Sequence, residues 1–343
     1  MKQLPFSSNI NNYALASIFN YTSATYKFYW FLGIIEEVES EKQRIPKENI
    51  FARMIANTWY PINYFKLSFG SQDKISEIIS YFKNSFPLYD NSEKRDIYKL
   101  LTDDDQETRK QLFHLDKNVP HKFLSPWYKG APKNIREKSQ NDTRDVIYRL
   151  YKNEILINEN WYRYIRSNSK ILKDFVYWNL GNFVQARNPS TPNVLSKLIK
   201  PAKRNSLTKQ RQKFWNIYLE QKPHTKCIFT NEVLDINNYH VDHFVPYSFV
   251  SHDLIWNLVP IDSNFNSSKN NKLPLKKHFE RFYTIQNDVI SFFGKTMPKN
   301  FKEEYLSIFP RFSENQNISF ETYQDVINPL ITVAHNNGFE YLE

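Results

Sequence analysis

Hydrophobic residues recur at helical spacing through the first half of the chain. The segment from Ala24 to Val38 is apolar along most of its length, and a second helical pattern runs from Ile50 to Trp59. Between them, Ile45-Pro46-Lys47-Glu48 has the composition of a turn that leads into a helix. Further helical patterns lie at Asp73 to Phe82, Lys94 to Leu101 and Asp145 to Tyr151. The pattern predicts a mainly helical N-terminal domain.

The composition agrees with this prediction. The chain has only 6 Gly but 22 Tyr, 27 Phe and 7 Trp, which suits a helical domain better than a sandwich with many tight turns. The two helices around Pro46 could form a helix-turn-helix, but an ordinary packed hairpin is favoured. The following aromatic residues are expected in the core rather than as platforms for stacking bases: Tyr26, Tyr29, Trp30, Trp59, Tyr60 and Tyr64.

A different pattern follows the predicted linker Arg187–Pro192, whose two prolines break any helix. Val241–Val245 has the β-branched and aromatic content of a short strand that ends at Pro246, and Leu254–Ile261 reads as a second strand. From Ser263 the sequence becomes polar and helical. A last helical pattern runs from Tyr323 to Asn336.

The first of these strands carries the candidate chemistry. Adjacent residues in a strand point to opposite faces, so Asp242 and His243 are expected to diverge. The Asp242 carboxylate can bind a divalent cation, while the His243 imidazole titrates near neutrality and can take a proton from water. His240 could reach the same side as Asp242, in a structural or substrate-contacting role. His252 and His278 are expected to face solvent.

Two asparagines complete the pattern. Asn257 interrupts the apolar second strand, and a buried amide must be hydrogen-bonded, so it is expected to tie down a loop or orient the histidine. Asn266 lies in the polar helix, on one face with Asn270. Strand, strand and helix could thus bring a carboxylate, an imidazole and an amide oxygen together.

At these residues the chain resembles the HNH endonuclease family, also called the ββα-metal nucleases, over roughly residues 222–282. The resemblance implies that His243 is the general base, that Asp242 and Asn266 bind Mg²⁺ or Mn²⁺, and that Asn257 supports the base. It also implies hydrolysis of a phosphodiester to a 5′-phosphate and a 3′-hydroxyl.

The chain departs from the family in one respect. Many HNH domains bind a structural zinc through two Cys-x-x-Cys pairs, but here the positions read Cys227-Ile-Phe-Thr230 and Asp262-Ser-Asn-Phe265. One cysteine cannot make a four-thiolate site, so no structural zinc is expected. Cys227 is expected to be buried, and packing must hold this domain. The candidate core residues are Phe229, Phe244, Val245, Trp256, Leu258 and Phe265.

Charge supports a nucleic-acid substrate. Residues 195–295 contain 15 Lys plus Arg and 8 Asp plus Glu, a net +7 of the chain's +10. A helix beginning near Ser206 would carry several cations on its polar side, although such a run can also be a solvated face. The upstream cations are Lys197, Lys200, Lys203, Arg204, Lys209, Arg211 and Lys213. The cations nearer the motif are the better candidates for phosphate contacts: Lys269, Lys272, Lys276 and Lys277.

The expected fold class is therefore α+β. A mainly helical domain over residues 1–190, for specificity, regulation or partner docking, precedes an HNH nuclease domain over 195–295 and a helical extension over 296–343. No run of about 18 apolar residues exists, so no membrane span is expected, and the amino terminus lacks the apolar region of a signal peptide. A single cysteine fits a reducing compartment, so a cytoplasmic protein is expected.

The function expected is metal-dependent cleavage of DNA, in duplex form, in restriction or anti-phage defence. Because one HNH site makes one cut, a homodimer or a partner subunit such as an ATPase could take part. Two alternatives stay open: a non-catalytic nucleic-acid-binding or complex-forming subunit with an HNH scaffold, and an RNase. The sequence argues against a non-catalytic scaffold, because it retains all four motif residues: Asp242, His243, Asn257 and Asn266.

Overall fold

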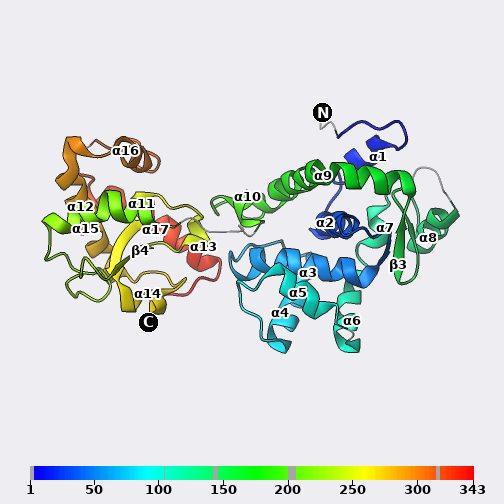
Figure 1. Ribbon diagram of the computed structural model, residues 1–343, viewed down its shortest axis with the longest axis horizontal. Helices are drawn as coiled ribbons and strands as arrows, with labels where there is room; N and C mark the ends of the chain where they lie inside the picture. Colours follow the sequence, from blue (N-terminus) through cyan, green and yellow to red (C-terminus); the bar gives the residue numbers. More distant parts are fainter. Residues whose placement is uncertain (1–3, 104, 142–145, 200–205, 314–316) are drawn as a thin grey trace. The chain divides into compact units, whose positions relative to one another are not determined.

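The computed structural model describes residues 4–103, 105–141, 146–199, 206–313 and 317–343. The protein is α+β, with many helices and, among these residues, two small antiparallel sheets. It divides into two compact units, Met1–Pro189 with Val194–Lys200 and Ser190–Asn193 with Pro201–Glu343 (Figure 1). No helix in the described ranges is long and apolar enough to cross a membrane.

Helices dominate the first unit. They are α1 (Asn12–Ala16), α2 (Tyr26–Glu39), α3 (Lys47–Asn63), α4 (Ile75–Ser85), α5 (Lys94–Leu101), α6 (Gln106–Leu112), the 3-10 helix η1 (Phe113–Leu115), α7 (Pro120–Phe123), α8 (Pro132–Asn141), α9 (Glu159–Gln185) and α10 (Val194–Lys197). The helices expected around Ala24–Val38, Ile50–Trp59, Asp73–Phe82 and Lys94–Leu101 are confirmed as α2, α3, α4 and α5.

Helix α2 is the centre of this unit. It lies between α3 and α9 (Figure 1), and every residue from Phe28 to Val38 is buried, as expected for a helix whose residues Phe28 to Ile35 are apolar all round. Of the aromatics predicted for the core, Tyr26, Tyr29, Trp30 and Trp59 are buried. The remaining two, Tyr60 and Tyr64, are partly buried and stack on each other with ring centroids 4.6 Å apart.

The sheet in this unit was not predicted. Strands β1 (Arg44–Pro46), β2 (Tyr148–Leu150) and β3 (Glu154–Ile157) form an antiparallel sheet in the order β1-β3-β2. The helix expected over Asp145–Tyr151 is therefore wrong where the structure describes it; Asp145 itself lies outside the described residues. The apolar, β-branched run Val146-Ile147 leads into β2, and pairing with β3 overrides the helical spacing.

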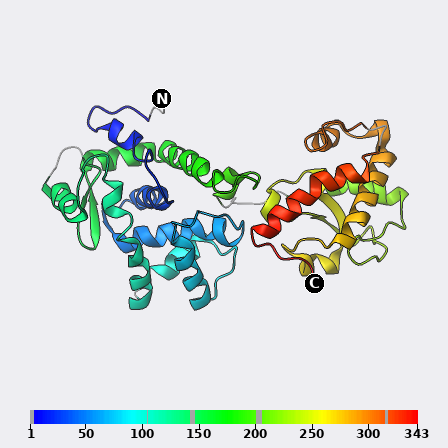
Figure 2. The same cartoon turned by 180° about the vertical axis from the view of Figure 1, so that it is seen from behind.

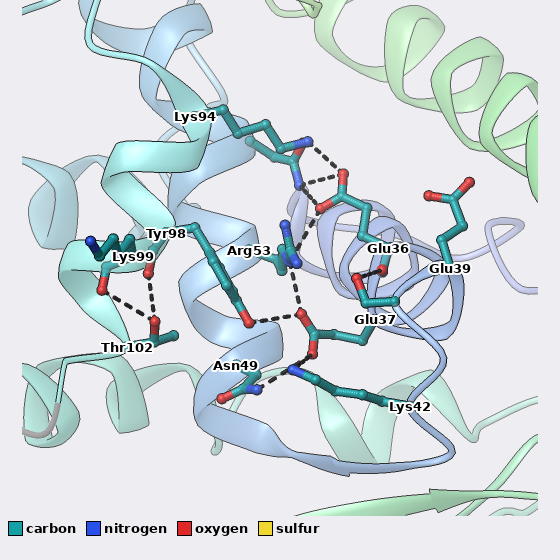
Figure 3. A network of polar contacts seen from close by, with 12 residues as sticks. Glu36, Glu37, Glu39, Lys42, Asn49, Arg53, Lys94, Tyr98, Lys99 and Thr102 are labelled. Atoms are coloured by element: carbon teal, nitrogen blue, oxygen red, sulfur yellow. Dashed lines mark hydrogen bonds and ion pairs between the residues drawn. The ribbon is translucent and has the colours of Figure 1, made fainter.

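A buried polar network joins three helices of the first unit (Figure 3). Adjacent residues Glu36 and Glu37 of α2 both point into it. Arg53 of α3 donates to Glu37 at 2.8 Å, and Tyr98 of α5 donates to the same carboxylate at 2.9 Å. Lys94 of α5 pairs with Glu36. The network thus ties α2 to α3 and α5.

The second unit contains the predicted strand, strand and helix. Its elements are α11 (Thr208–Gln210), the π-helix η2 (Arg211–Trp215), α12 (Asn216–Gln221), β4 (Tyr239–His243), α13 (Tyr247–Val250), the 3-10 helix η3 (Ile255–Asn257), β5 (Leu258–Asp262), α14 (Ser263–Lys269), α15 (Lys276–Phe293), the 3-10 helix η4 (Gly294–Thr296), α16 (Lys299–Leu306) and α17 (Phe320–Asn336). The helix expected from Tyr323 to Asn336 is confirmed as α17, drawn in red in Figure 2.

One core holds this unit together. Phe244, which follows β4, stacks on Phe282 of α15 with ring centroids 3.9 Å apart, and Phe282 meets Tyr323 of α17 edge-on. Of the predicted core residues, Phe229, Phe244, Val245, Trp256 and Leu258 are buried and Phe265 is partly buried. The helices after residue 295 share this core with the strands.

Candidate functional site

Strands β4 and β5 place Asp242, His243 and the adjoining Asn257 toward one end of a two-stranded ribbon. They pair antiparallel, with Asp242 opposite Val259 and His243 opposite Leu258. The second strand is shorter than predicted, because residues 255–257 form the 3-10 turn η3 and β5 begins only at Leu258. Asn257 therefore ends a turn rather than interrupting a strand.

Helix α14 follows β5 without a loop. The Asp262 side chain accepts hydrogen bonds from the backbone N–H of Asn264 at 2.9 Å and of Phe265 at 3.2 Å, so the last strand residue is also the helix N-cap. This abrupt start brings the first turns of α14 back against the strands. Asn266 and Lys269 both come from this helix.

His243 is buried, with 1% of its surface exposed. Its Nε2 lies 2.9 Å from Oδ1 of Asp253, and its Nδ1 lies 3.8 Å from Oδ1 of Asp242. The expected divergence of Asp242 and His243 is therefore wrong. His243 is the last residue of β4, where the strand's strict alternation ends and the two side chains can approach.

Asp242 is held as a carboxylate. Burial by itself raises its pKa, but the Lys269 ammonium, with Nζ 2.9 Å from Oδ2, and the neighbouring His243 outweigh burial and hold the pKa well below its ordinary range. Asp242 is therefore ionised at neutral pH. It is a partly buried, negatively charged oxygen donor.

Asn257 ties down the segment after β4. Its side chain accepts a hydrogen bond from the Val245 N–H and donates one to the Val245 carbonyl, both at 2.8 Å, and its own carbonyl accepts from the Phe244 N–H at 2.7 Å. Because Phe244 and Val245 directly follow His243, these bonds hold the backbone that carries the imidazole. Asn257 is fully buried.

Asn266 and His240 contact each other at the exposed side of the site. The Asn266 Nδ2 lies 3.1 Å from Nδ1 of His240. With the amide nitrogen directed at the imidazole, the amide oxygen Oδ1 faces away from His240. Asn266 therefore has an oxygen that is not used in this contact and is of the type that hard cations prefer.

The predicted phosphate-binding residues are spread over several elements. Lys269 is buried and pairs with Asp242. The Nζ of Lys272 lies 3.6 Å from Oε1 of Glu343. Lys276 and Lys277 are exposed in the first turn of α15. Lys209 and Lys213 are exposed, and the Arg211 guanidinium lies 4.6 Å from the centre of the Tyr239 ring.

The other upstream cations are Lys197, Lys200, Lys203 and Arg204. Lys197 belongs to the first unit, where it is buried and burial lowers its pKa to about 7. Lys200, Lys203 and Arg204 lie outside the described residues. Two further histidines differ from expectation: His278 is buried, with a pKa lowered to about 4 by burial and by Lys277 and Arg281, and His252 is half-buried with its ring 5.1 Å from Trp256.

Sequence reasoning missed Asp253, the carboxylate next to His243. One signal in the sequence could have pointed to this residue: Asp253 is the only acidic residue between Asp242 and Asp262. It also missed Lys269 as the partner of Asp242. Cys227 is buried as predicted, and its sulfur lies 3.5 Å from the Asp262 N–H. Over the described ranges, no group of three His, Cys, Asp or Glu side chains is placed to hold a metal.

Comparison with known proteins finds a family match for the segment that contains these residues. Residues 226–275 match the family described as HNH endonuclease, which confirms the resemblance for this segment of the chain. The match contains Asp242, His243, Asn257 and Asn266. It indicates a nuclease domain, hence a nucleic-acid substrate, and domains of this family generally use a divalent metal ion. No curated protein and no solved structure matches the chain.

Proposed function

We propose that this protein is a metal-dependent endonuclease that hydrolyses phosphodiester bonds of duplex DNA. The observation that carries the proposal is the pairing of an ionised carboxylate, Asp242, with a buried imidazole, His243, inside the segment that matches the HNH family. One group is suited to holding a cation and the other to moving a proton.

The donor atoms fit a hard divalent ion such as Mg²⁺ or Mn²⁺. Asp242 offers a carboxylate oxygen that stays ionised, and Asn266 offers the amide oxygen that its contact with His240 turns outward. When bound there, the ion would neutralise charge on the phosphate. Two protein ligands leave room for water and substrate oxygens, as Mg²⁺ prefers.

His243 is the proposed general base, which accepts a proton from water. With Nε2–H donating to the Asp253 carboxylate, the neutral ring has its lone pair on Nδ1, on the side of Asp242. Nδ1 takes a proton from water, the water oxygen attacks phosphorus, and the bond from phosphorus to the 3′ oxygen breaks. The products are a 5′-phosphate and a 3′-hydroxyl, whose proton comes from solvent.

Cleavage of supercoiled plasmid by the full-length protein, with Mg²⁺, Mn²⁺ or EDTA, tests the proposal. We expect nicked or linear product with either metal and none with EDTA. His243→Ala should abolish cleavage while DNA binding is retained, and Asp242→Ala should reduce both the rate and the metal dependence. His224→Ala, an exposed histidine of the same unit, is the matched control.

The competing functions give different results. Cleavage of RNA but not of DNA under the same conditions would make the protein an RNase. DNA binding by a pure, folded protein that cuts neither nucleic acid would favour a scaffold or a complex-forming subunit. Cleavage that persists in His243→Ala would overturn the assignment of the base.

A setting in restriction or anti-phage defence is proposed by analogy with other fusions of HNH domains to additional domains. The first unit has none of the four motif residues, so specificity, regulation or docking of a partner subunit is assigned to it. One site makes one cut, so cleavage of both strands would need a homodimer or a partner subunit such as an ATPase.

A further inference from the structure

We propose that Asp253 is a positioning residue that holds His243 in the tautomer needed to accept a proton from water. The proposal rests on the proposed nuclease function and extends it to a residue outside the four-residue motif. The contact between Asp253 Oδ1 and His243 Nε2, at 2.9 Å, is the observation that carries it.

This contact can determine which nitrogen of the His243 ring carries the proton. His243 is 1% exposed, whereas 20% of the Asp253 side chain is exposed, so the carboxylate remains partly hydrated while it contacts a buried imidazole. An ionised carboxylate can only accept a hydrogen bond, so Nε2 must be the nitrogen that carries the proton. The lone pair of the neutral ring is then on Nδ1.

The loop that carries Asp253 is anchored from two sides. Gln210 of α11 donates from Nε2 to the Asp253 carbonyl at 3.1 Å, and the Ile255 N–H donates to the Glu304 carboxylate of α16 at 2.7 Å. Ser251, with φ of 56°, turns the chain out of α13 in the left-handed region just before the loop. The position of Asp253 is therefore determined by packed elements on both sides.

These anchors lie outside the segment that matches the family. Gln210 precedes residue 226 and Glu304 follows residue 275. The helices that flank the family segment thus support the loop on which the histidine's partner sits. Helices α11 and α16 thus help to position the partner of the histidine.

The chemical consequence concerns the step in which the water loses its proton. Nδ1 accepts that proton, and the ring becomes an imidazolium whose Nε2–H still donates to Asp253. The carboxylate offsets the positive charge as it forms and keeps the ring from rotating. After the leaving oxygen has taken a proton from solvent, Nδ1 returns its proton to water and the cycle closes.

The test compares Asp253→Asn and Asp253→Ala with wild type in the full-length protein. An amide at this position can donate to Nε2 and so favours the opposite tautomer, whereas alanine favours neither. We expect kcat to fall about 100-fold in both, the size typical of a lost acid–base contribution, with KM and DNA binding unchanged. Asp288→Asn, an exposed carboxylate of the same unit, is the control.

A second readout does not depend on activity. Nitrogen-15 NMR of histidine-labelled, metal-free protein distinguishes the two ring tautomers, and the His243 signals are those missing from His243→Ala. We expect the Nε2–H form in wild type, the Nδ1–H form in Asp253→Asn and a mixture in Asp253→Ala. A merely structural role for Asp253 would lower the melting temperature without changing the tautomer.

The outcomes separate the two proposals. Wild-type tautomer and kcat in a folded Asp253→Ala protein, which has no side-chain acceptor for Nε2–H, would overturn the role of Asp253 while leaving the nuclease in place. Absence of cleavage by wild type would overturn the nuclease, and the NMR result would still decide whether Asp253 selects the tautomer.

Discussion

Among the described residues, the buried charges near His243 and in the polar network of the first unit are paired with opposite charges. Lys269 lies within 2.9 Å of Asp242 and also 5.8 Å from the centre of the Phe229 ring. A cation bound to Asp242 would share the carboxylate with this ammonium or displace it. Lys269 thus keeps Asp242 ionised and oriented, because an unpaired buried charge would cost several kcal/mol.

Glu37 shows the same physics in the first unit (Figure 3). Burial by itself raises its pKa, but hydrogen bonds from Lys42 and Arg53 outweigh burial and hold the pKa below its ordinary value of 4.5. A carboxylate whose pKa is lower in the folded state stabilises the fold above its unfolded pKa. That stability is lost as the pH falls through the folded pKa.

Replacing Glu37 should therefore have a pH-dependent effect on stability. We expect Glu37→Gln to lower the free energy of unfolding by on the order of 2 kcal/mol at pH 7, because Arg53 and Lys42 lose their counter-charge. The difference from wild type should narrow below pH 4.5, where the unfolded wild type becomes protonated. Urea unfolding of both proteins between pH 3 and 7 measures this difference in the free energy of unfolding.

The control for this experiment is Glu77→Gln. Glu77 is 68% exposed in its pair with Lys74, and exposed pairs contribute about 0–1 kcal/mol. A Glu37→Gln protein as stable as wild type at pH 7, or a difference that stays constant down to pH 3, would contradict the argument.

At the scale of elements, helix α15 carries two exposed lysines where cations are least favoured. Lys276 and Lys277 occupy its first turn, and no acidic residue lies there. The helix dipole places partial positive charge at that end, so each lysine costs about 0.3–1 kcal/mol of stability. Residues that oppose local stability are best explained by a binding role, here to phosphate.

The double variant Lys276→Ala with Lys277→Ala tests this role. We expect DNA binding to weaken, and the slope of log K against log salt to become shallower by about 2, since each phosphate contact contributes roughly 0.9. The melting temperature should stay the same or rise, because the unfavourable charges are gone. Binding titrations at several salt concentrations and a thermal melt measure the two effects.

Two exposed lysines of α8 provide the comparison. Lys133→Ala with Lys138→Ala removes the same charge from the first unit, which contains none of the four motif residues. An equal loss of salt dependence in both double variants would show a non-specific effect of net charge and would exclude a particular role for α15.

At the scale of the whole molecule, the two units have separate hydrophobic cores. One core uses residues between Ile10 and Leu198, and the other uses residues between Phe214 and Leu342. The second core includes helices α16 and α17, so the nuclease segment and the C-terminal helices form one packed body. A unit with its own closed core can fold by itself.

We therefore expect a fragment of residues 190–343 to fold and to retain metal-dependent cleavage. The fragment keeps all four motif residues, Asp253 and both anchors of its loop. A cooperative thermal transition by circular dichroism and plasmid cleavage by the fragment, with His243→Ala in the same fragment as control, measure the two properties. A fragment without a cooperative transition, or a folded fragment without activity where the full chain cuts, would contradict this expectation.

The sequence by itself determined the segment that matches a known family, and it predicted helices α2, α3, α4, α5 and α17. Asp242, His243, Asn257 and Asn266 are recognisable because their spacing is set along the chain, and residues 226–275 match the family that the spacing suggested. Helices such as α2 and α5 were predictable because a run of local hydrogen bonds and a continuous apolar pattern need no distant partner.

The tertiary structure alone decided which groups meet. Strand β2 needs β3, and a strand's hydrogen bonds come from another segment, so local periodicity misassigned residues 146–151. The approach of Asp242 to His243, the burial of Lys269 and His278, and the loop that delivers Asp253 depend on packing between elements. Spacing along the chain shows which residues can do chemistry, but folding sets the distances that determine their charge, their hydrogen bonds and their tautomer.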